Sequence, residues 1–278
     1  MPELPEIQAH AERLTAEYAG ATLQRFQPLS FVALKTAVPP PDAAYGRALD
    51  EVGRRGKYLL ARFGDHTFVI HLMQGGRLKP DEKQAAKPRF GVARWRFDDG
   101  RAWLLTEQGT ERKAGVWVLA GEVEGQSPLA GLGPEADTLG TLELGARLRA
   151  QPMRLHGFLR DQQALAGLGR LLANEVCWTA RLSPFTSTSK LKEPEVEALA
   201  AAIGQCVEDG LAYERTRPDM SSSADRPGAV HRRTGEACPR CGDTIRAVEY
   251  RSYVVCYCPT CQTGGKVLAD NTTSKFLK

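Results

Sequence analysis

Residues 238–261 read CPRCGDTIRAVEYRSYVVCYCPTC, and the Cys-x-x-Cys motifs at the two ends of this stretch determine how the C-terminal part folds. The motifs CPRC and CPTC are separated by 16 residues. That spacing fits a tetrahedral zinc site on a β-hairpin, because each motif supplies two thiolates and the hairpin spans the gap. Four thiolates leave no position open for water, so we expect one structural Zn²⁺ per chain. Its expected ligands are Cys238, Cys241, Cys258 and Cys261.

Two alternatives to this ligand set remain at the level of sequence. Cys256 offers a third thiol beside CPTC, although the knuckle spacing favours Cys258 and Cys261. The four cysteines could also form disulfides, but we expect a cytoplasmic protein, in which disulfides are rare. The N-terminus lacks the residue order of a signal peptide, and no apolar run approaches the ~18 residues of a membrane span. We therefore expect no association with membranes.

The charge of the chain is concentrated at its C-terminal end. The net charge is +4, and residues 226–278 hold nine Lys/Arg against four Asp/Glu, whereas the rest of the chain is nearly balanced. This asymmetry indicates a local surface that faces a polyanion, with a merely solvated basic tail as the alternative. Hydrophobic content of 42% and charged content of 25% are typical of a globular protein.

The N-terminal half reads as one helix followed by strands. Apolar residues recur on one helical face from Leu4 to Tyr18, and Gly20 can end that helix. YLLARFG (58–64) and TFVIHLM (67–73) flank a Gly-Asp turn, and RWRFDDGRAWLLTE (94–107) alternates around Asp-Asp-Gly. These are hairpin signals, and they predict a β-sandwich or a barrel.

Residues 141–210 change to helical periodicity. We expect four helical segments, at TLELGARLRA, RLHGFLRDQQ, GRLLANEVCWTA and EPEVEALAAAIGQCVEDGL. Residues 214–236 are polar with few apolar anchors, and they predict a mobile loop that leads into the cysteine-rich tail.

Several motifs, taken together with the paired cysteines, resemble the formamidopyrimidine/endonuclease VIII family of DNA glycosylases. They are MPELPEI (1–7), RGKYLL (55–60), HLMQGGRL (71–78) and LGPEAD (132–137). The resemblance covers nearly the whole chain. It implies an α+β multidomain protein that repairs DNA by base excision, located in the bacterial cytoplasm at the nucleoid, and we expect a monomer. The implied partner is damaged duplex DNA, with single-stranded DNA as an alternative.

The resemblance also assigns domains along the chain. The N-terminal β-sandwich catalytic domain with its leading α-helix is expected at 1–122, followed by a linker at 123–140. A helical helix-two-turn-helix DNA-binding domain is expected at 141–235, and a C-terminal β-hairpin zinc ribbon at 236–265. Residues 266–278 form an extension that is either a tail or an extra basic strand on DNA.

The resemblance implies that Pro2 is the nucleophile once Met1 is removed. An α-amino group has a pKa near ~8, so more of it is unprotonated at neutral pH than of a lysine. Attack of this secondary amine on the sugar C1′ gives an iminium, which permits β- and δ-elimination of the phosphates. Glu3 is the implied general acid/base at the ring oxygen, and Glu6 is the second carboxylate near the site. Lys57 matches the family's phosphate-binding lysine.

The resemblance places further DNA contacts on the loops and on the C-terminal part. They are His71, Gln74, Arg77, Arg112, Lys113, Arg170 and Arg251. Other tail arginines, at 232, 233, 240 and 246, are also candidates for phosphate contacts.

Some of these positions depart from the family pattern. Gln74 stands where a methionine is expected, and Ala114 stands where a phenylalanine is expected, so no aromatic wedge remains to fill the gap of a flipped base. Arg170 replaces a phosphate-binding asparagine. Tyr253 replaces an arginine of the zinc hairpin, and Arg251, two residues earlier, would share its face if both lay on one strand.

Three functions follow from the sequence. The first is a bifunctional DNA glycosylase and abasic-site lyase. Within it, the altered wedge favours oxidised pyrimidines, lesions in single strands, or bulky and crosslinked adducts. The second is a non-catalytic DNA-damage-binding protein on the same fold, and the third is a zinc-ribbon protein that acts on RNA or on a protein partner.

Overall fold

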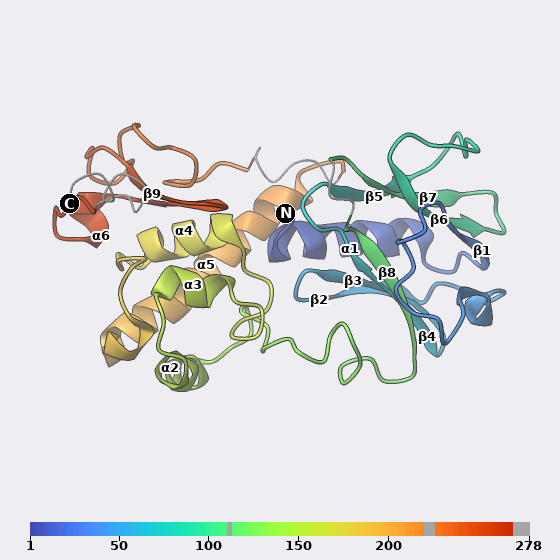
Figure 1. The fold of residues 1–278 in the computed structure, drawn as a ribbon, viewed down its shortest axis with the longest axis horizontal. Helices are drawn as coiled ribbons and strands as arrows, with labels where there is room; N and C mark the ends of the chain where they lie inside the picture. The colour runs from blue at the N-terminus through green and yellow to red at the C-terminus, as the bar shows by residue number, and fades with distance from the viewer. Residues whose placement is uncertain (110–112, 220–225, 269–278) are drawn as a thin grey trace. The chain divides into compact units, whose positions relative to one another are not determined.

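The structure is a computed structural model, and it describes residues 1–109, 113–219 and 226–268. The chain forms two compact units. The N-terminal unit contains Met1–Gly131 and Leu211–Asp225, and the C-terminal unit contains Leu132–Gly210 and Arg226–Lys278. In Figure 1 the strands of the N-terminal unit run from blue to green, and the helices of the C-terminal unit are coloured from green to red.

The N-terminal unit is a sandwich of two antiparallel sheets, each with four strands among the described residues. One sheet has the order β1-β6-β7-β5 and the other has the order β2-β3-β4-β8. The strands are β1 (Leu23–Pro28), β2 (Glu51–Arg55), β3 (Tyr58–Phe63), β4 (His66–His71), β5 (Gly76–Pro80), β6 (Gly91–Phe97), β7 (Ala102–Glu107) and β8 (Gly115–Ala120). A short 3₁₀ helix, η1 (Pro41–Ala44), follows β1.

The two sheets share one apolar core, which confirms the predicted sandwich. Phe68 on β4 and Trp95 on β6 come from different sheets, and their ring centroids lie 6.0 Å apart. The predicted hairpins are β3–β4 and β6–β7, with Tyr58 opposite His71 in the first. Alternation of apolar residues therefore placed one face of these strands in the core.

Helix α1 (Leu4–Tyr18) packs against β2 and β3 and carries the start of the chain. Its predicted apolar face, from Leu4 to Tyr18, is buried, and from Ile7 onward it belongs to the sandwich core. The helix ends at Tyr18, and Ala19 is its C-cap residue. Gly20 follows in the left-handed region, at φ 86°. A glycine adopts this conformation without the strain that a Cβ would add.

The C-terminal unit contains the predicted helices, except that the last one continues from Leu211 as part of the N-terminal unit. They are α2 (Thr141–Ala150), α3 (Leu155–Arg160), α4 (Arg170–Thr179) and α5 (Glu193–Arg215), with the short 3₁₀ helix η2 (Thr188–Lys190) before α5. Helix α3 is shorter than the predicted segment 154–163. The reason is a turn at Asp161, whose Oδ1 accepts a hydrogen bond from the backbone N–H of Gln163 and so replaces the next helical turn.

The ribbon at the end of the unit consists of the antiparallel strands β9 (Arg246–Tyr250) and β10 (Tyr253–Tyr257), followed by α6 (Pro259–Gln262). Its apolar cluster is small and contains Val230, Ile245 and three cysteines. The predicted fold class is confirmed in its three parts: sandwich, helical domain and hairpin ribbon. Within the described residues, no helix has the length and apolarity that crossing a membrane requires.

Candidate functional site

The first residues of α1 bury two carboxylates beside the start of the chain. Glu3 is the N-cap residue and Glu6 lies in the first turn, and their side chains are only 4% and 2% exposed. The backbone N–H of Glu3 donates to Oε2 of Glu6 at 3.0 Å, and the backbone of Glu6 bonds the Glu3 side chain in return. This reciprocal capping box fixes both carboxylates where the chain enters the helix.

Four charged side chains act on the amino group of Met1. Burial is the largest cause that lowers the pKa of this amine. Glu3 and Glu6 oppose the shift, whereas Arg77 and Lys57 add to it. The structure therefore brings together, around the start of the chain, the predicted residues from α1, from the β2–β3 turn and from the start of β5. An amine with a lowered pKa holds more of the unprotonated, nucleophilic form near neutral pH.

Lys57 comes from the tight turn between β2 and β3. The turn contains Gly56 at φ 55°, a left-handed conformation that favours glycine. The lysine side chain is only 7% exposed, which is unusual for a residue type that is normally solvated. Its charge lowers the pKa of both the Met1 amino group and His71.

His71 ends strand β4 and holds the loop that follows. Its Nδ1 accepts a hydrogen bond from the backbone N–H of Met73 at 3.1 Å, and its ring centroid lies 4.5 Å from that of Tyr58. Burial, with a smaller effect of Lys57, lowers the pKa of His71 to about 4. The imidazole is therefore neutral at pH 7, as its acceptor role requires. Met73 has φ 52°, so the loop conformation is a constrained one.

The loop from Met73 to Gly76 lies against a second loop. A Cβ on Gly75 would collide with the backbone oxygen of Gln108, so only glycine permits this approach. Gln74 is exposed at the tip. Of the second loop, Lys113 is exposed and Arg112 lies outside the described residues.

Sequence reasoning missed the residue that holds the base of the second loop. The buried carboxylate of Glu107, at the end of β7, accepts the backbone N–H of Ala114 at 2.7 Å. Ala114 itself is 1% exposed, so its side chain faces the core. The only sequence signal for Glu107 was a charged residue at the end of an otherwise apolar strand.

In the C-terminal unit, helix α4 carries Arg170 and Glu175. Arg170 is the first residue of the helix and is exposed. Glu175 accepts the backbone N–H groups of Ala229, Val230 and His231 at 2.6, 3.0 and 2.8 Å. Residues 226–236, predicted as part of a mobile loop, are therefore anchored by one carboxylate; residues 220–225 of the same predicted loop lie outside the described part of the chain.

The four predicted zinc ligands converge at the base of the ribbon. Their ligand atoms lie within 4.8 Å of one another, and the Sγ atoms of Cys241 and Cys258 are 3.4 Å apart. The Sγ atoms of Cys238 and Cys261 are 3.9 Å apart. Sulfurs at about 2.3 Å from one tetrahedral ion are separated by about 3.8 Å, so the cluster fits a metal. Cys256 lies outside it, with its Sγ 3.8 Å from Oγ1 of Thr234.

The hairpin places the two candidate residues at its turn differently. Tyr253 is on β10, whereas Arg251 lies in the turn between the strands and is exposed. The rule that alternate strand residues share a face therefore does not apply to Arg251. Sequence reasoning also missed two side chains of α3, His156 and Arg160, that lie beside the Tyr253 ring.

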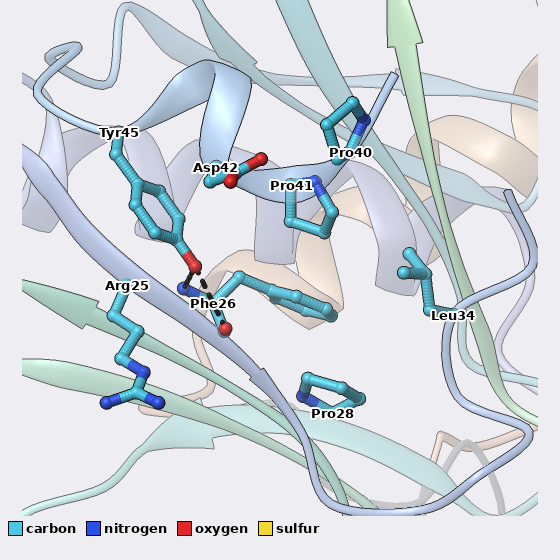
Figure 2. A pocket seen from close by; sticks show the side chains of 8 residues that line it. All are labelled: Arg25, Phe26, Pro28, Leu34, Pro40, Pro41, Asp42 and Tyr45. Carbon is cyan, nitrogen blue, oxygen red and sulfur yellow. Dashed lines mark hydrogen bonds between the residues drawn. The ribbon is translucent and has the colours of Figure 1, made fainter. Parts of the chain in front are cut away.

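A pocket in the N-terminal unit lies between η1 and β1. Figure 2 shows its lining, which includes Phe26, Pro40 and Pro41. The hydroxyl of Tyr45 closes one side by hydrogen bonds to the backbone N–H and oxygen of Phe26, at 3.0 and 3.1 Å. None of the charged residues around the start of the chain lines this pocket.

Comparison with known proteins identifies the family. Residues 1–116 match the formamidopyrimidine-DNA glycosylase N-terminal domain and residues 130–221 match the formamidopyrimidine-DNA glycosylase H2TH domain. The formamidopyrimidine-DNA glycosylase of Chloroflexus aurantiacus is 31% identical over 94% of this chain and 98% of the relative. The corresponding enzyme of Symbiobacterium thermophilum is 33% identical over 94% and 89%.

Solved structures give the same answer at the level of the fold. The MutM (Fpg) protein of Thermus thermophilus matches with a TM-score of 0.80 and 26% identity, over 96% of this chain and 100% of that one. A Lactococcus lactis Fpg mutant in complex with DNA that contains Fapy-dG has a TM-score of 0.81 at 21% identity, over 94% and 100%. The chain therefore belongs to the formamidopyrimidine-DNA glycosylase family.

Proposed function

We propose that this protein is a base-excision DNA glycosylase that also cleaves the abasic strand. The observation that carries the proposal is that Glu3, Glu6, Lys57 and Arg77 all act on the amino group of Met1, the residue next to Pro2. This arrangement supports an amine nucleophile flanked by carboxylates and by cations. The named relatives, which are formamidopyrimidine-DNA glycosylases, support DNA as the substrate.

In the proposed reaction, removal of Met1 makes Pro2 the terminal secondary amine. Its nitrogen attacks C1′ of the damaged nucleotide, the glycosidic bond breaks, and the base leaves. Glu3, fixed by the capping box, transfers a proton to the ring oxygen as the sugar opens. The resulting iminium withdraws electrons and so acidifies the C2′ proton; loss of that proton to solvent expels the 3′ phosphate, and loss of the C4′ proton then expels the 5′ phosphate.

The same site supplies contacts for the flanking phosphates. Lys57 and Arg77 bring positive charge beside the amine, and both suppress its protonation. Cations in these positions can bind phosphate, and they favour the unprotonated form of an amine beside them. We assign Lys57 to the phosphate next to the pocket. Gln74 and Lys113, both exposed on their loops, contact the DNA around the flipped base.

We assign Zn²⁺ to the four-cysteine cluster. Thiolate ligands and a tetrahedral arrangement are typical of structural zinc. The ribbon's own apolar cluster is small, so the metal stabilises the hairpin fold rather than taking part in chemistry.

The loops support a proposal about the lesion class. Ala114 is buried and Gln74 is the exposed tip residue, so these positions offer no large aromatic wedge. We propose that the enzyme prefers oxidised pyrimidines, lesions in single strands, or bulky adducts that a large wedge would exclude. We propose that it acts as a monomer in the bacterial cytoplasm.

Borohydride trapping tests the chemistry. The purified protein is mixed with duplex DNA that holds one abasic site, borohydride is added, and a covalent adduct is sought by gel electrophoresis. We expect an adduct in the wild type and none in Pro2→Gly. Mass spectrometry must show that Met1 is absent from the wild type. Absence of an adduct from such protein, with DNA binding intact, would contradict the proposed lyase.

A non-catalytic DNA-damage-binding protein is the second candidate. It is favoured by the capping box, which gives Glu3 and Glu6 a purely structural task at the helix start. For such a protein, the variants Pro2→Gly and Glu3→Gln would bind abasic DNA as well as the wild type does. The wild type itself would leave the strand uncut. The trapping experiment separates the two functions directly.

A further inference from the structure

The turn end of the β9–β10 hairpin carries stacked aromatic rings. Tyr250 and Tyr253 are opposite each other across the two strands, and their ring centroids are 4.6 Å apart with planes inclined by 11°. The imidazole of His156, from α3, is nearly parallel to the Tyr253 ring at 5.9 Å. These contacts attach the end of the hairpin to α3 within the C-terminal unit.

Arg160, the last residue of α3, lies over the same tyrosine. Its Cζ atom is 3.8 Å from the centroid of the Tyr253 ring. A guanidinium in this position is attracted by the π face of the ring, while its N–H donors lie in its own plane and point away from the ring. The stack therefore orients the guanidinium before any ligand arrives. Binding then costs less side-chain entropy than for an unrestrained arginine.

Further positive charge surrounds this stack. Arg154, before α3, donates from its Nη1 to the hydroxyl of Tyr250 at 2.6 Å. Burial, together with Arg160, His231 and Arg170, lowers the pKa of His156 to about 3. These neighbours are arginines and histidines, so their charged forms are all positive. Groups of like charge held together repel one another, and an anion bound among them relieves that repulsion.

We propose that Arg160, positioned by Tyr253, binds a backbone phosphate of DNA. This assignment rests on the proposed function, which makes DNA the substrate. A guanidinium matches the oxygens of a phosphate through parallel hydrogen bonds, and a nucleic acid presents phosphates in a row that several arginines can share. Arg251 lies in the exposed turn, and among the described residues no aromatic ring stacks on its guanidinium. Tyr253 is thus a positioning residue.

The salt dependence of DNA binding tests the assignment. Fluorescence anisotropy is measured on a duplex with a tetrahydrofuran abasic analogue, which the enzyme cannot cleave, over a series of KCl concentrations. For Arg160→Ala we expect Kd to rise about tenfold at 0.1 M KCl and the slope of log K against log [KCl] to become shallower by about 1. Arg149→Ala, which removes an exposed arginine of α2 in the same unit, is the matched control and should change neither.

A double-mutant cycle separates positioning from a general structural role. Tyr253→Leu removes the ring and should weaken binding several-fold, whereas Tyr253→Phe keeps the ring and should bind as the wild type does. In the Arg160→Ala background, Tyr253→Leu should have no further effect. Equal effects of Tyr253→Leu in both backgrounds would overturn the positioning role. Zinc content and thermal midpoint confirm that each variant is folded, and Arg160→Gln replaces Arg160→Ala if the latter is not.

The outcomes also separate this assignment from the proposed function. Wild-type binding with its full salt slope in Arg160→Ala would overturn the role of Arg160 and leave the glycosylase proposal intact. Failure of the wild type to bind the duplex at low salt would overturn both.

Discussion

At the scale of single residues, the site depends on charges that the fold holds close to one amine. Lys57 is buried, and it lowers the pKa of both the amine and His71. Replacing it by alanine removes the cation that we assign to the phosphate next to the pocket and that lowers the pKa of the Met1 amino group. We expect Lys57→Ala to lower both the affinity for abasic duplex and the trapping rate by at least tenfold. A tenfold change corresponds to about 1.4 kcal/mol. Unchanged binding would contradict this role, and Lys83→Ala, an exposed lysine of the same unit, is the control.

His10 provides a test of burial through pH. Burial, with Arg13 as the next cause, lowers the pKa of this helix residue to about 3. Its folded form stays neutral, while the unfolded chain takes up a proton below about pH 6.5. Its contribution to stability is therefore complete above pH 6.5 and decreases as the pH falls towards 3.

Urea unfolding at pH 7 and pH 5 measures this effect. Between these two values the wild type should lose about 2 kcal/mol through His10 alone. In His10→Gln the free energy of unfolding should change less between pH 7 and pH 5, by about that amount. This expectation does not depend on the variant's stability at pH 7. An unchanged difference would show that His10 is not buried in its neutral form.

At the scale of elements, Glu175 attaches a long segment to helix α4. Its carboxylate accepts three successive backbone N–H groups, from Ala229 to His231. Glu175→Gln keeps the size of the side chain but removes its charge. One carboxylate oxygen becomes an NH₂ group, which cannot accept a hydrogen bond from the backbone N–H groups that it faces. We expect a loss of about 2 to 3 kcal/mol in thermal unfolding. Glu208→Gln, exposed on α5, should change stability by less than about 0.5 kcal/mol.

The ribbon offers a matched pair of cysteine variants. Cys238 belongs to the four-cysteine cluster, whereas Cys256 is buried outside it. Cys238→Ser should reduce bound zinc well below one ion per chain and should weaken DNA binding, because the hairpin depends on the metal to fold. Cys256→Ala should retain one zinc. Full zinc content in Cys238→Ser, measured by atomic absorption, would refute the assigned ligand set.

At the scale of the whole molecule, DNA affinity should come mainly from phosphates. We assign phosphate contacts to cations in both units, including Lys57, Arg77, Arg160 and Arg170. Each neutralised phosphate adds about −0.9 to the slope of log K against log [salt], so these four contacts predict a slope of about −3.6 for the wild type. A slope near zero would mean that binding does not use the phosphate backbone. The same titration on undamaged duplex gives the part of the DNA affinity that does not depend on the lesion.

The sequence predicted the architecture well because the relevant signals are local. Periodicity of two and of 3.6 residues, glycine turns and the spacing of two Cys-x-x-Cys motifs depend only on near neighbours in the chain. They were sufficient for the sandwich, the helices and the four-cysteine cluster. Helix α3 ended earlier than predicted because a side-chain turn at Asp161 competed with the helix.

What the sequence by itself determined is therefore the list of elements and of chemically suited residues: Pro2, Glu3, Glu6 and Lys57, and the cysteine pairs. The tertiary structure alone decided which residues act on one another. Glu107 beneath Ala114, Glu175 beneath residues 229–231, and Arg160 over Tyr253 join positions that are remote or unremarkable in sequence. Burial and close approach set pKa values and orient side chains, and both depend on how distant segments pack, which no local pattern encodes.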